Sequence, residues 1–142
     1  MSSPVTLSGS CLCGGVKYRV AGDVLTAVNC HCSMCRKAHG AAFRPGVIVK
    51  VRDLSWVKGE ALVVDYRSSE QIHRLFCRTC GSHMLARSDL HPAIASIAVG
   101  TLDGDLPFGI AQHWNVASKA SWFEITDDLP QHAVVPAPPA PR

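Results

Sequence analysis

The segment CHCSMC, residues 30–35, places three cysteines within six residues. Two further groups accompany it, CLC at 11–13 and CRTC at 77–80, and the three groups contain all seven cysteines of the chain. Cysteines that only fill an apolar core would not cluster in this way, and an odd number cannot all form disulfides. The spacings are typical of metal ligands, because C-x-C and C-x-x-C bring two sulfur atoms close together. A metal-binding fold is therefore the first prediction.

Length and composition indicate one compact globular domain. The chain has 142 residues, of which 47% are hydrophobic and 18% are charged, and a chain of this size buries roughly two-thirds of its surface on folding. No apolar run approaches the ~20 residues of a membrane-spanning helix, and the first residues show no secretory signal. We therefore expect a cytoplasmic protein without a membrane partner, in a compartment that keeps thiols reduced.

Short alternating or β-branched runs, broken by Gly, Asp or Pro, predict a mainly β fold of antiparallel sheets. The expected strands are 15–20, 26–29, 47–51, 62–66, 72–76 and 94–99, with 110–114 as a weaker candidate. One short helix is expected at 33–39, with Ser33 as its N-cap. The Pro/Ala-rich end, residues 131–142, is predicted to be a disordered tail, because proline cannot donate to a β-ladder.

The ligand count predicts two different metal sites. The CRTC pair follows a predicted strand, and by spacing alone it could join either other group. Two pairs supply four thiolates, which complete a tetrahedral structural site. The middle group, Cys30, Cys32 and Cys35, then supplies three, and a zinc ion with three protein ligands and one open position has the design of a catalytic site. Zinc is the favoured metal because it binds thiolates tetrahedrally, and an iron–sulfur cluster is the alternative.

A closed second site is the competing interpretation. His39 lies four residues after Cys35, so both would lie on one face of the expected helix and could form a Cys₃His structural site without catalytic chemistry. His31 is a weaker candidate, because alternation along an extended chain turns it away from the cysteines on either side.

Several motifs are familiar as a set. They are GSCLCGGVKY at 9–18, CHCSMCRK at 30–37, YRSS at 66–69, FCRTCGS at 76–82, GTLD at 100–103 and the late Trp122. With them the sequence resembles the glutathione-dependent formaldehyde-activating enzyme family, which also contains the centromere protein V relatives. The resemblance covers residues 8–130, which we take as one zinc-binding domain.

The resemblance implies a fold and a set of ligands. The fold would be a mainly β, tent-like arrangement of sheets meeting at a zinc site, and each chain would hold two Zn²⁺ ions. The structural zinc would be held by four cysteines, Cys11, Cys13, Cys77 and Cys80. The catalytic zinc would be held by three, Cys30, Cys32 and Cys35.

The resemblance also implies a reaction. The family's named activity adds the thiol of glutathione to formaldehyde and gives S-hydroxymethylglutathione, which is carbon–sulfur lyase chemistry in reverse. We therefore expect a zinc-dependent carbon–sulfur lyase-type enzyme whose partner is a small-molecule thiol, glutathione by resemblance. The alternative is a non-catalytic, zinc-stapled interaction module, as the centromere-associated relatives suggest.

Basic residues close to the middle cysteine group are candidates for substrate binding. In the expected mechanism, the open zinc position binds the substrate thiol as thiolate and orients it against an aldehyde carbonyl. Arg36, Lys37 and Arg44 could then hold substrate carboxylates. Their alternative roles are a solvated helix face, or charge balance for the anionic thiolates.

Net charge argues against a nucleic-acid partner. The formal charge of +3 takes no account of thiolates, and seven thiolates with two zinc ions would bring it to zero. Aromatic residues are few, at 6%, and do not alternate with basic ones. We therefore expect no nucleic-acid binding. We also expect Trp56, Trp114 and Trp122 to be core anchors, and His113 is a candidate for facing the pocket.

Overall fold

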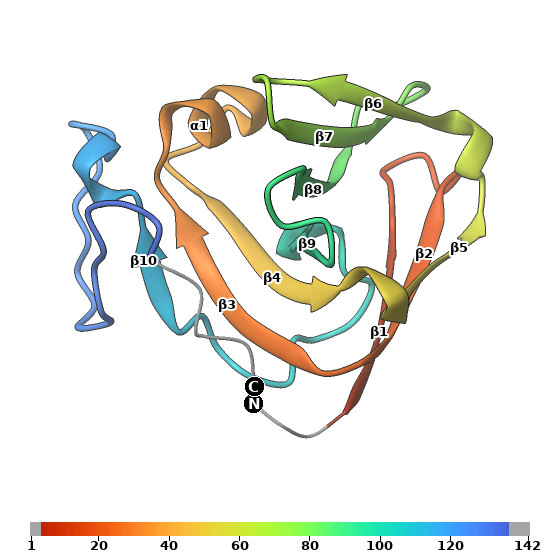
Figure 1. The fold of residues 1–142 in the computed structure, drawn as a ribbon, viewed down its shortest axis with the longest axis horizontal. Helices are drawn as coiled ribbons and strands as arrows, with labels where there is room; N and C mark the ends of the chain where they lie inside the picture. Colours follow the sequence, from red (N-terminus) through yellow and green to blue (C-terminus); the bar gives the residue numbers. More distant parts are fainter. Residues whose placement is uncertain (1–3, 137–142) are drawn as a thin grey trace.

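The structure, a computed structural model, describes residues 4–136 of the chain, and these residues form two β-sheets and one α-helix (Figure 1). The larger sheet has the strand order β10-β3-β4-β9-β8-β7-β6, and the smaller one has the order β1-β2-β5. Neighbouring strands are antiparallel except β10 and β3, which are parallel. The mainly β class predicted from the sequence is confirmed.

The strands are short, from three to seven residues. They are β1 (Val5–Ser10), β2 (Lys17–Gly22), β3 (Val24–Cys30), β4 (Arg44–Lys50), β5 (Leu54–Lys58), β6 (Val63–Arg67), β7 (Ile72–Cys77), β8 (His83–Ser88), β9 (Ile94–Ala98) and β10 (Gln112–Trp114). Single 3-10 turns follow β4, β5, β9 and β10, at Val51–Asp53, Glu60–Leu62, Val99–Thr101 and Val116–Ser118.

Alternation explains how the two sheets share one core. In β2, Tyr18 and Val20 are buried while Lys17 and Arg19 are exposed, so one face of the smaller sheet is apolar. That face packs on the inner residues of the larger sheet, whose central strands β4 and β9 contribute Val47, Val49 and Ile97, all fully buried. The seven predicted strands are all present, within a few residues of their expected bounds.

Three strands were missed from the sequence, namely β1, β5 and β8. The sequence of β1, VTLSGS, ends in small polar residues that weakly favour a strand. Its pairing depends on β2, because Gly9 lies opposite Tyr18 and leaves room for the tyrosine ring. Pairing with β2, and not the composition of β1 itself, therefore stabilises this strand.

The predicted helix is confirmed as α1 (Ser33–His39), but its cap is different from the one expected. Ser33 is the first helical residue, and Cys32 is the N-cap, with its sulfur accepting a hydrogen bond from the Cys35 backbone N–H at 3.2 Å. Gly40 ends the helix in the left-handed conformation, φ 58°, which glycine adopts without steric cost. The cap is thus one of the cysteines of the middle group.

The first residues of the predicted tail contact the folded part of the chain. Residues 131–133 are paired with β10 and the segment after it: His132 donates its N–H to the His113 carbonyl at 2.9 Å, and Val116 donates to the His132 carbonyl at 3.0 Å. The folded part therefore continues past residue 130, and residues 137–142 of the predicted tail lie outside the described residues. Within residues 4–136, no helix has the length and apolar character needed to cross a membrane.

Candidate metal centre

The first cysteine cluster joins the two sheets. Its sulfur atoms, from Cys11, Cys13, Cys77 and Cys80, all lie within 4.8 Å of one another. The first pair lies in the loop between β1 and β2 of the smaller sheet; of the second pair, Cys77 ends β7 and Cys80 lies in the turn before β8 of the larger sheet. The spacing left open which group the CRTC pair joins, and the structure places it with the CLC pair. Together they supply the four thiols that a tetrahedral site needs.

Both loops of this cluster are turns. Gly14 donates its N–H to the Cys11 carbonyl at 3.0 Å, so CLC lies in a turn. In the other loop, Gly81 has φ 80°, which glycine adopts readily, and donates to the Cys77 carbonyl at 2.7 Å. The Ser82 hydroxyl lies 3.3 Å from the Cys80 sulfur and lowers the pKa of that thiol to about 5, which favours the thiolate that binds metal.

The second cluster contains Cys30, Cys32 and Cys35, again with sulfur atoms within 4.8 Å of one another. Cys30 ends β3, Cys32 caps α1, and Cys35 lies in the first turn of that helix. Within residues 4–136, no fourth Cys, His, Asp or Glu atom joins this group. His39 lies outside it, and its ring instead packs against that of His83, with ring centroids 5.1 Å apart. His39 is therefore not a member of the second cluster in this structure.

Two buried arginines surround the second cluster. Arg74 of β7 donates to the Cys35 sulfur at 3.6 Å and to the Ser68 hydroxyl at 3.1 Å. Arg44 of β4 is the cross-strand partner of Cys30 and donates to the Ser96 hydroxyl and carbonyl at 2.6 and 2.7 Å. Each residue is 4% exposed, and within the described part of the chain neither forms an ion pair with a carboxylate. Two buried positive charges therefore lie near the second cluster, and Arg74 contacts one of its sulfur atoms directly.

This environment favours at least one thiolate. The pKa of Cys32 is lowered to about 2, chiefly because the Cys30 and Cys35 side chains hydrogen-bond to its sulfur, with a further contribution from the Arg74 charge. The pKa of Cys30 is raised by the same interactions. Burial, and then Arg44, lower the pKa of His39 to about 4, so this imidazole adds no positive charge at neutral pH.

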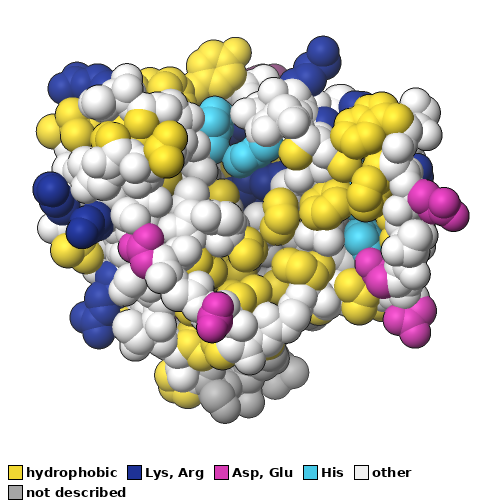
Figure 2. All heavy atoms as spheres, turned by 180° about the vertical axis from the view of Figure 1, so that it is seen from behind, with side chains coloured by type: hydrophobic (Ala, Val, Ile, Leu, Met, Phe, Trp, Pro, Cys, Tyr) yellow, Lys and Arg dark blue, Asp and Glu magenta, His cyan; other side chains and the backbone are white. Residues whose placement is uncertain are grey.

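The three basic residues proposed from the sequence lie in different environments. Lys37 is exposed on α1, and Arg36 is half-buried, with its Nε lacking a hydrogen-bond partner. Arg44 is buried with its guanidinium bonded to Ser96, which fits the alternative of charge balance for the thiolates. Figure 2 shows histidine side chains beside Lys or Arg side chains in a recessed part of one face.

Two buried histidines beside the second cluster connect it to a surface carboxylate. His113, proposed to face the pocket, is 2% exposed and lies 2.8 Å from His31 through ring nitrogens. Its other ring nitrogen lies 3.0 Å from both carboxylate oxygens of Asp127. Asn115 donates its side-chain amide N–H to the Cys30 sulfur at 3.2 Å. Arg74, Asn115 and Asp127 were missed from the sequence, where no spacing motif distinguishes them.

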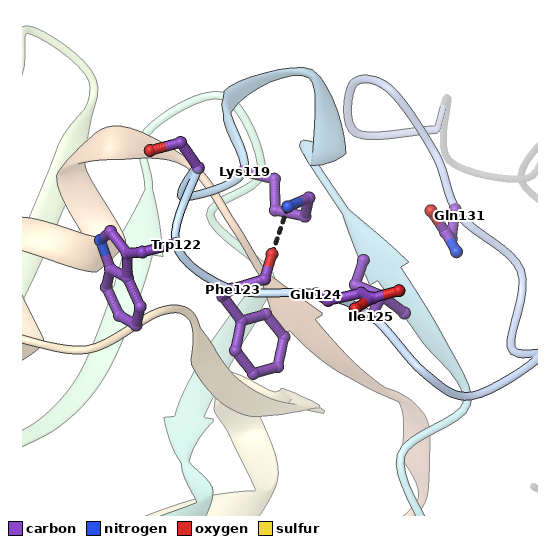
Figure 3. A pocket seen from close by; sticks show the side chains of 7 residues that line it. Lys119, Trp122, Phe123, Glu124, Ile125 and Gln131 are labelled. Carbon is purple, nitrogen blue, oxygen red and sulfur yellow. Dashed lines mark hydrogen bonds between the residues drawn. The ribbon is translucent and has the colours of Figure 1, made fainter.

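A shallow hollow lies apart from the cysteine clusters. It is lined by residues of the segment 119–125 and by Gln131 (Figure 3). The Lys119 ammonium donates to the Phe123 carbonyl and fixes this loop. Trp122, expected in the core, is 72% exposed, whereas Trp56 and Trp114 are partly buried as anchors. Phe123 takes the inner position instead, with its ring 5.3 Å from that of Phe43.

Comparison with known proteins agrees with the geometry. The chain is 29% identical over 126 residues to a Halomonas elongata protein that is named, as a provisional assignment, a glutathione-dependent formaldehyde-activating enzyme, and the match covers 84% of this chain and 80% of the relative. A crystal structure of a Rhodobacter sphaeroides protein superimposes with a TM-score of 0.59 at 28% identity, covering 70% of this chain and 91% of that one. The family model described as glutathione-dependent formaldehyde-activating enzyme matches residues 6–122. The chain belongs to the glutathione-dependent formaldehyde-activating enzyme family.

Proposed function

We propose that the protein is a zinc-dependent enzyme that forms or cleaves the adduct of a thiol and an aldehyde, with glutathione and formaldehyde as the reactants. The observation that carries the proposal is the difference between the two clusters, four thiols in one and three in the other. A complete set of four suits a structural zinc, and an incomplete set leaves a position for a substrate sulfur.

The donor atoms fit zinc. All seven ligands are thiols, none of them in a disulfide, and soft sulfur donors in groups of three or four select Zn²⁺ over harder cations. Seven free thiols also favour a reducing compartment such as the cytoplasm. A zinc ion at Cys30, Cys32 and Cys35 would lower the pKa of a thiol bound at its fourth position and fix the direction of its sulfur lone pair.

The reaction is an addition that balances without a redox partner. The substrate sulfur forms a bond to the carbonyl carbon, the C=O π bond breaks, and the thiol proton ends on the new hydroxyl oxygen. The buried charges of Arg44 and Arg74 would favour an anionic sulfur at this cluster, because no carboxylate among residues 4–136 pairs with either of them. Arg36 and Lys37, near the outer end of the cluster, would attract the carboxylates of glutathione.

Cobalt substitution tests the proposal directly. Two metals per chain are expected, and the absorption spectrum of one of them should shift when glutathione is added, because a fourth sulfur enters its coordination sphere. The Cys35→Ser variant should keep the four-cysteine metal and lose both the spectral shift and the turnover of glutathione with formaldehyde.

A spectrum of two metals that does not respond to glutathione would contradict the proposal. In that case the second site is closed, and the protein is better described as a zinc-stapled interaction module. A spectral shift with a different small thiol, but not with glutathione, would support the chemistry and change only the substrate.

A further inference from the structure

Asn115 occupies an unusual backbone conformation beside the three-cysteine cluster. It is the one non-glycine residue within 4–136 with a positive φ, 60°, and it directs its amide N–H at the Cys30 sulfur, 3.2 Å away. Asparagine tolerates this left-handed region better than most residues, but the conformation is still sparsely populated. Such a conformation persists when surrounding contacts hold it in place.

Backbone hydrogen bonds hold the segment that carries Asn115. Strand β10 pairs in parallel with the end of β3, with Trp114 opposite Cys30. The His31 N–H donates to the Trp114 carbonyl at 2.9 Å, and the Val116 N–H donates to the His132 carbonyl at 3.0 Å. The residues on both sides of Asn115 are thus fixed relative to the cysteine loop.

A series of side-chain hydrogen bonds adds a second connection between the cysteine loop and β10. His31, which lies between Cys30 and Cys32 in the sequence and is 0% exposed, meets His113 at 2.8 Å. His113 in turn meets the Asp127 carboxylate at 3.0 Å, and the carboxylate lies at the surface. A carboxylate that bonds one ring nitrogen sets which nitrogen of the histidine carries the proton. Asp127 therefore orients His113 toward His31.

We infer that Asn115 is a positioning residue of the three-cysteine metal site, held against Cys30 by the Asp127–His113–His31 chain, an inference that rests on the proposed function. An N–H donor fixes the direction of the sulfur lone pairs and stabilises the thiolate that binds metal. Partners of this kind commonly contribute a factor of about 10–100 in metal affinity. The segment 113–127 is accordingly part of the metal site, although it contains no ligand.

Two substitutions at one position separate the donor from the backbone. Asn115→Gly keeps the positive φ and removes the donor, and Asn115→Asp keeps the shape and places a carboxylate against the sulfur. Zinc affinity is measured on the full chain by competition with a chelator, together with the sulfur-to-cobalt charge-transfer bands. Both variants should lower the zinc affinity of the three-cysteine site by about tenfold or more and shift its charge-transfer bands, and Asn115→Asp should have the larger effect. The four-cysteine site in the same titration reports that the fold is intact.

The Asp127–His113–His31 series is tested separately at Asp127, its surface end. Asp127→Asn should weaken the same site by a smaller factor, and Asp128→Asn, at the exposed neighbouring carboxylate, should leave both sites unchanged. Two metals bound with wild-type affinity in both Asn115 variants would overturn the positioning role while leaving the proposed function intact. Equal affinities for Asp127→Asn and Asp128→Asn would overturn the part of the inference that concerns the chain. A single metal in the wild-type protein would overturn the proposed function and, with it, this inference.

Discussion

The two cysteine clusters differ in the charge around their sulfur atoms. Around the three-cysteine cluster, Arg44 and Arg74 place two buried positive charges against up to three thiolates. With Zn²⁺ bound, the total there would be close to +1, which favours an anionic fourth ligand. Four thiolates with Zn²⁺ would total −2 and gain nothing from a further anion. On the proposed function, the charges around the sulfur atoms, and not the sulfur atoms alone, would distinguish the substrate site from the structural one.

Arg74 should therefore control the pH at which the three-cysteine cluster binds metal. Replacing it, Arg74→Gln, removes a charge that lowers the pKa of Cys32, so a higher pH is needed to form the thiolates. We expect the pH midpoint of cobalt binding at this cluster to rise and its affinity at pH 7 to fall by about tenfold.

The matched control is Arg78→Gln, at an exposed arginine in the turn of the other cluster. It should leave the midpoint of the three-cysteine cluster unchanged. Equal midpoints for Arg74→Gln and wild type would mean that the guanidinium only fills space beside Cys35.

At the scale of strands, β6, β7 and the end of β8 are linked by a histidine between two carboxylates. His73 of β7 bonds Asp65 at 2.8 Å through one ring nitrogen and Asp89 at 2.9 Å through the other. Arg87 and Arg67 bond the same two carboxylates at 3.1 and 3.4 Å. The two carboxylates raise the pKa of His73, and His73 in turn lowers the pKa of Asp89.

This cluster should make stability depend on pH in a defined direction. Because the pKa of His73 is raised in the folded state, the protonated ring stabilises the fold fully below about pH 6.5, and this stabilisation is lost as pH rises through the folded-state pKa. Because the pKa of Asp89 is lowered, its carboxylate stabilises the fold above about pH 4, and this stabilisation is lost as pH falls through the folded-state pKa. The thermal midpoint of His73→Gln should therefore fall further below wild type at about pH 5 than at about pH 9.

The His91→Gln variant, at an exposed histidine, is the control and should follow wild type at both values. Differences from wild type are compared at each pH, because zinc binding is itself pH-dependent. A pH-independent difference for His73→Gln would show that the ring contributes packing alone.

The smaller sheet depends on a glycine where two strands meet. A Cβ at Gly9 would overlap the ring of Tyr18, which is 1% exposed and whose hydroxyl lies 2.6 Å from the Thr101 hydroxyl. Gly9→Ala should displace the ring and lower the free energy of unfolding by about 1–3 kcal/mol. Gly104→Ala, where an added Cβ meets nothing within 4 Å, is the matched control. Urea unfolding of the two variants with equal midpoints would refute the steric argument.

In the whole molecule, the four-cysteine cluster connects the smaller sheet to the larger one. It connects residues 64 apart, Cys13 and Cys77, whose sulfur atoms lie 3.9 Å apart. If zinc occupies both clusters, its removal by a chelator should destabilise the fold, and the four-cysteine site should account for most of the loss, because it holds the smaller sheet against the larger one.

Thermal unfolding of two variants measures this division. We expect Cys80→Ser to lower the midpoint by about 10 °C or more, since about 1 kcal/mol corresponds to about 4 °C in a domain of this size. Cys35→Ser should lower it by much less, because its cluster lies within one sheet and its helix. Equal losses in the two variants would contradict the distinction between a structural and a substrate site.

Local sequence determined the cysteine groups, the helix and the alternating strands. These features depend on residues within a few positions of one another, as in the C-x-x-C spacing of Cys77 and Cys80, so spacing and alternation are sufficient to predict them. Weak strands such as β1 and β8 could not be predicted in this way, because partners on other strands provide their stability.

Only the tertiary structure decided what surrounds the open cluster. Arg74 reaches Cys35 across 39 residues, and Asn115 reaches Cys30 across 85. The Asn115 contact follows from the pairing of β10 with the end of β3, and the Arg74 contact forms although β3 and β7 are not neighbours in the sheet. No local pattern marks an arginine or an asparagine for such a contact, since each is an ordinary surface residue by composition. The sequence by itself therefore determined which sulfur atoms could bind metal, and the packing of the sheets decided which charges and donors they meet.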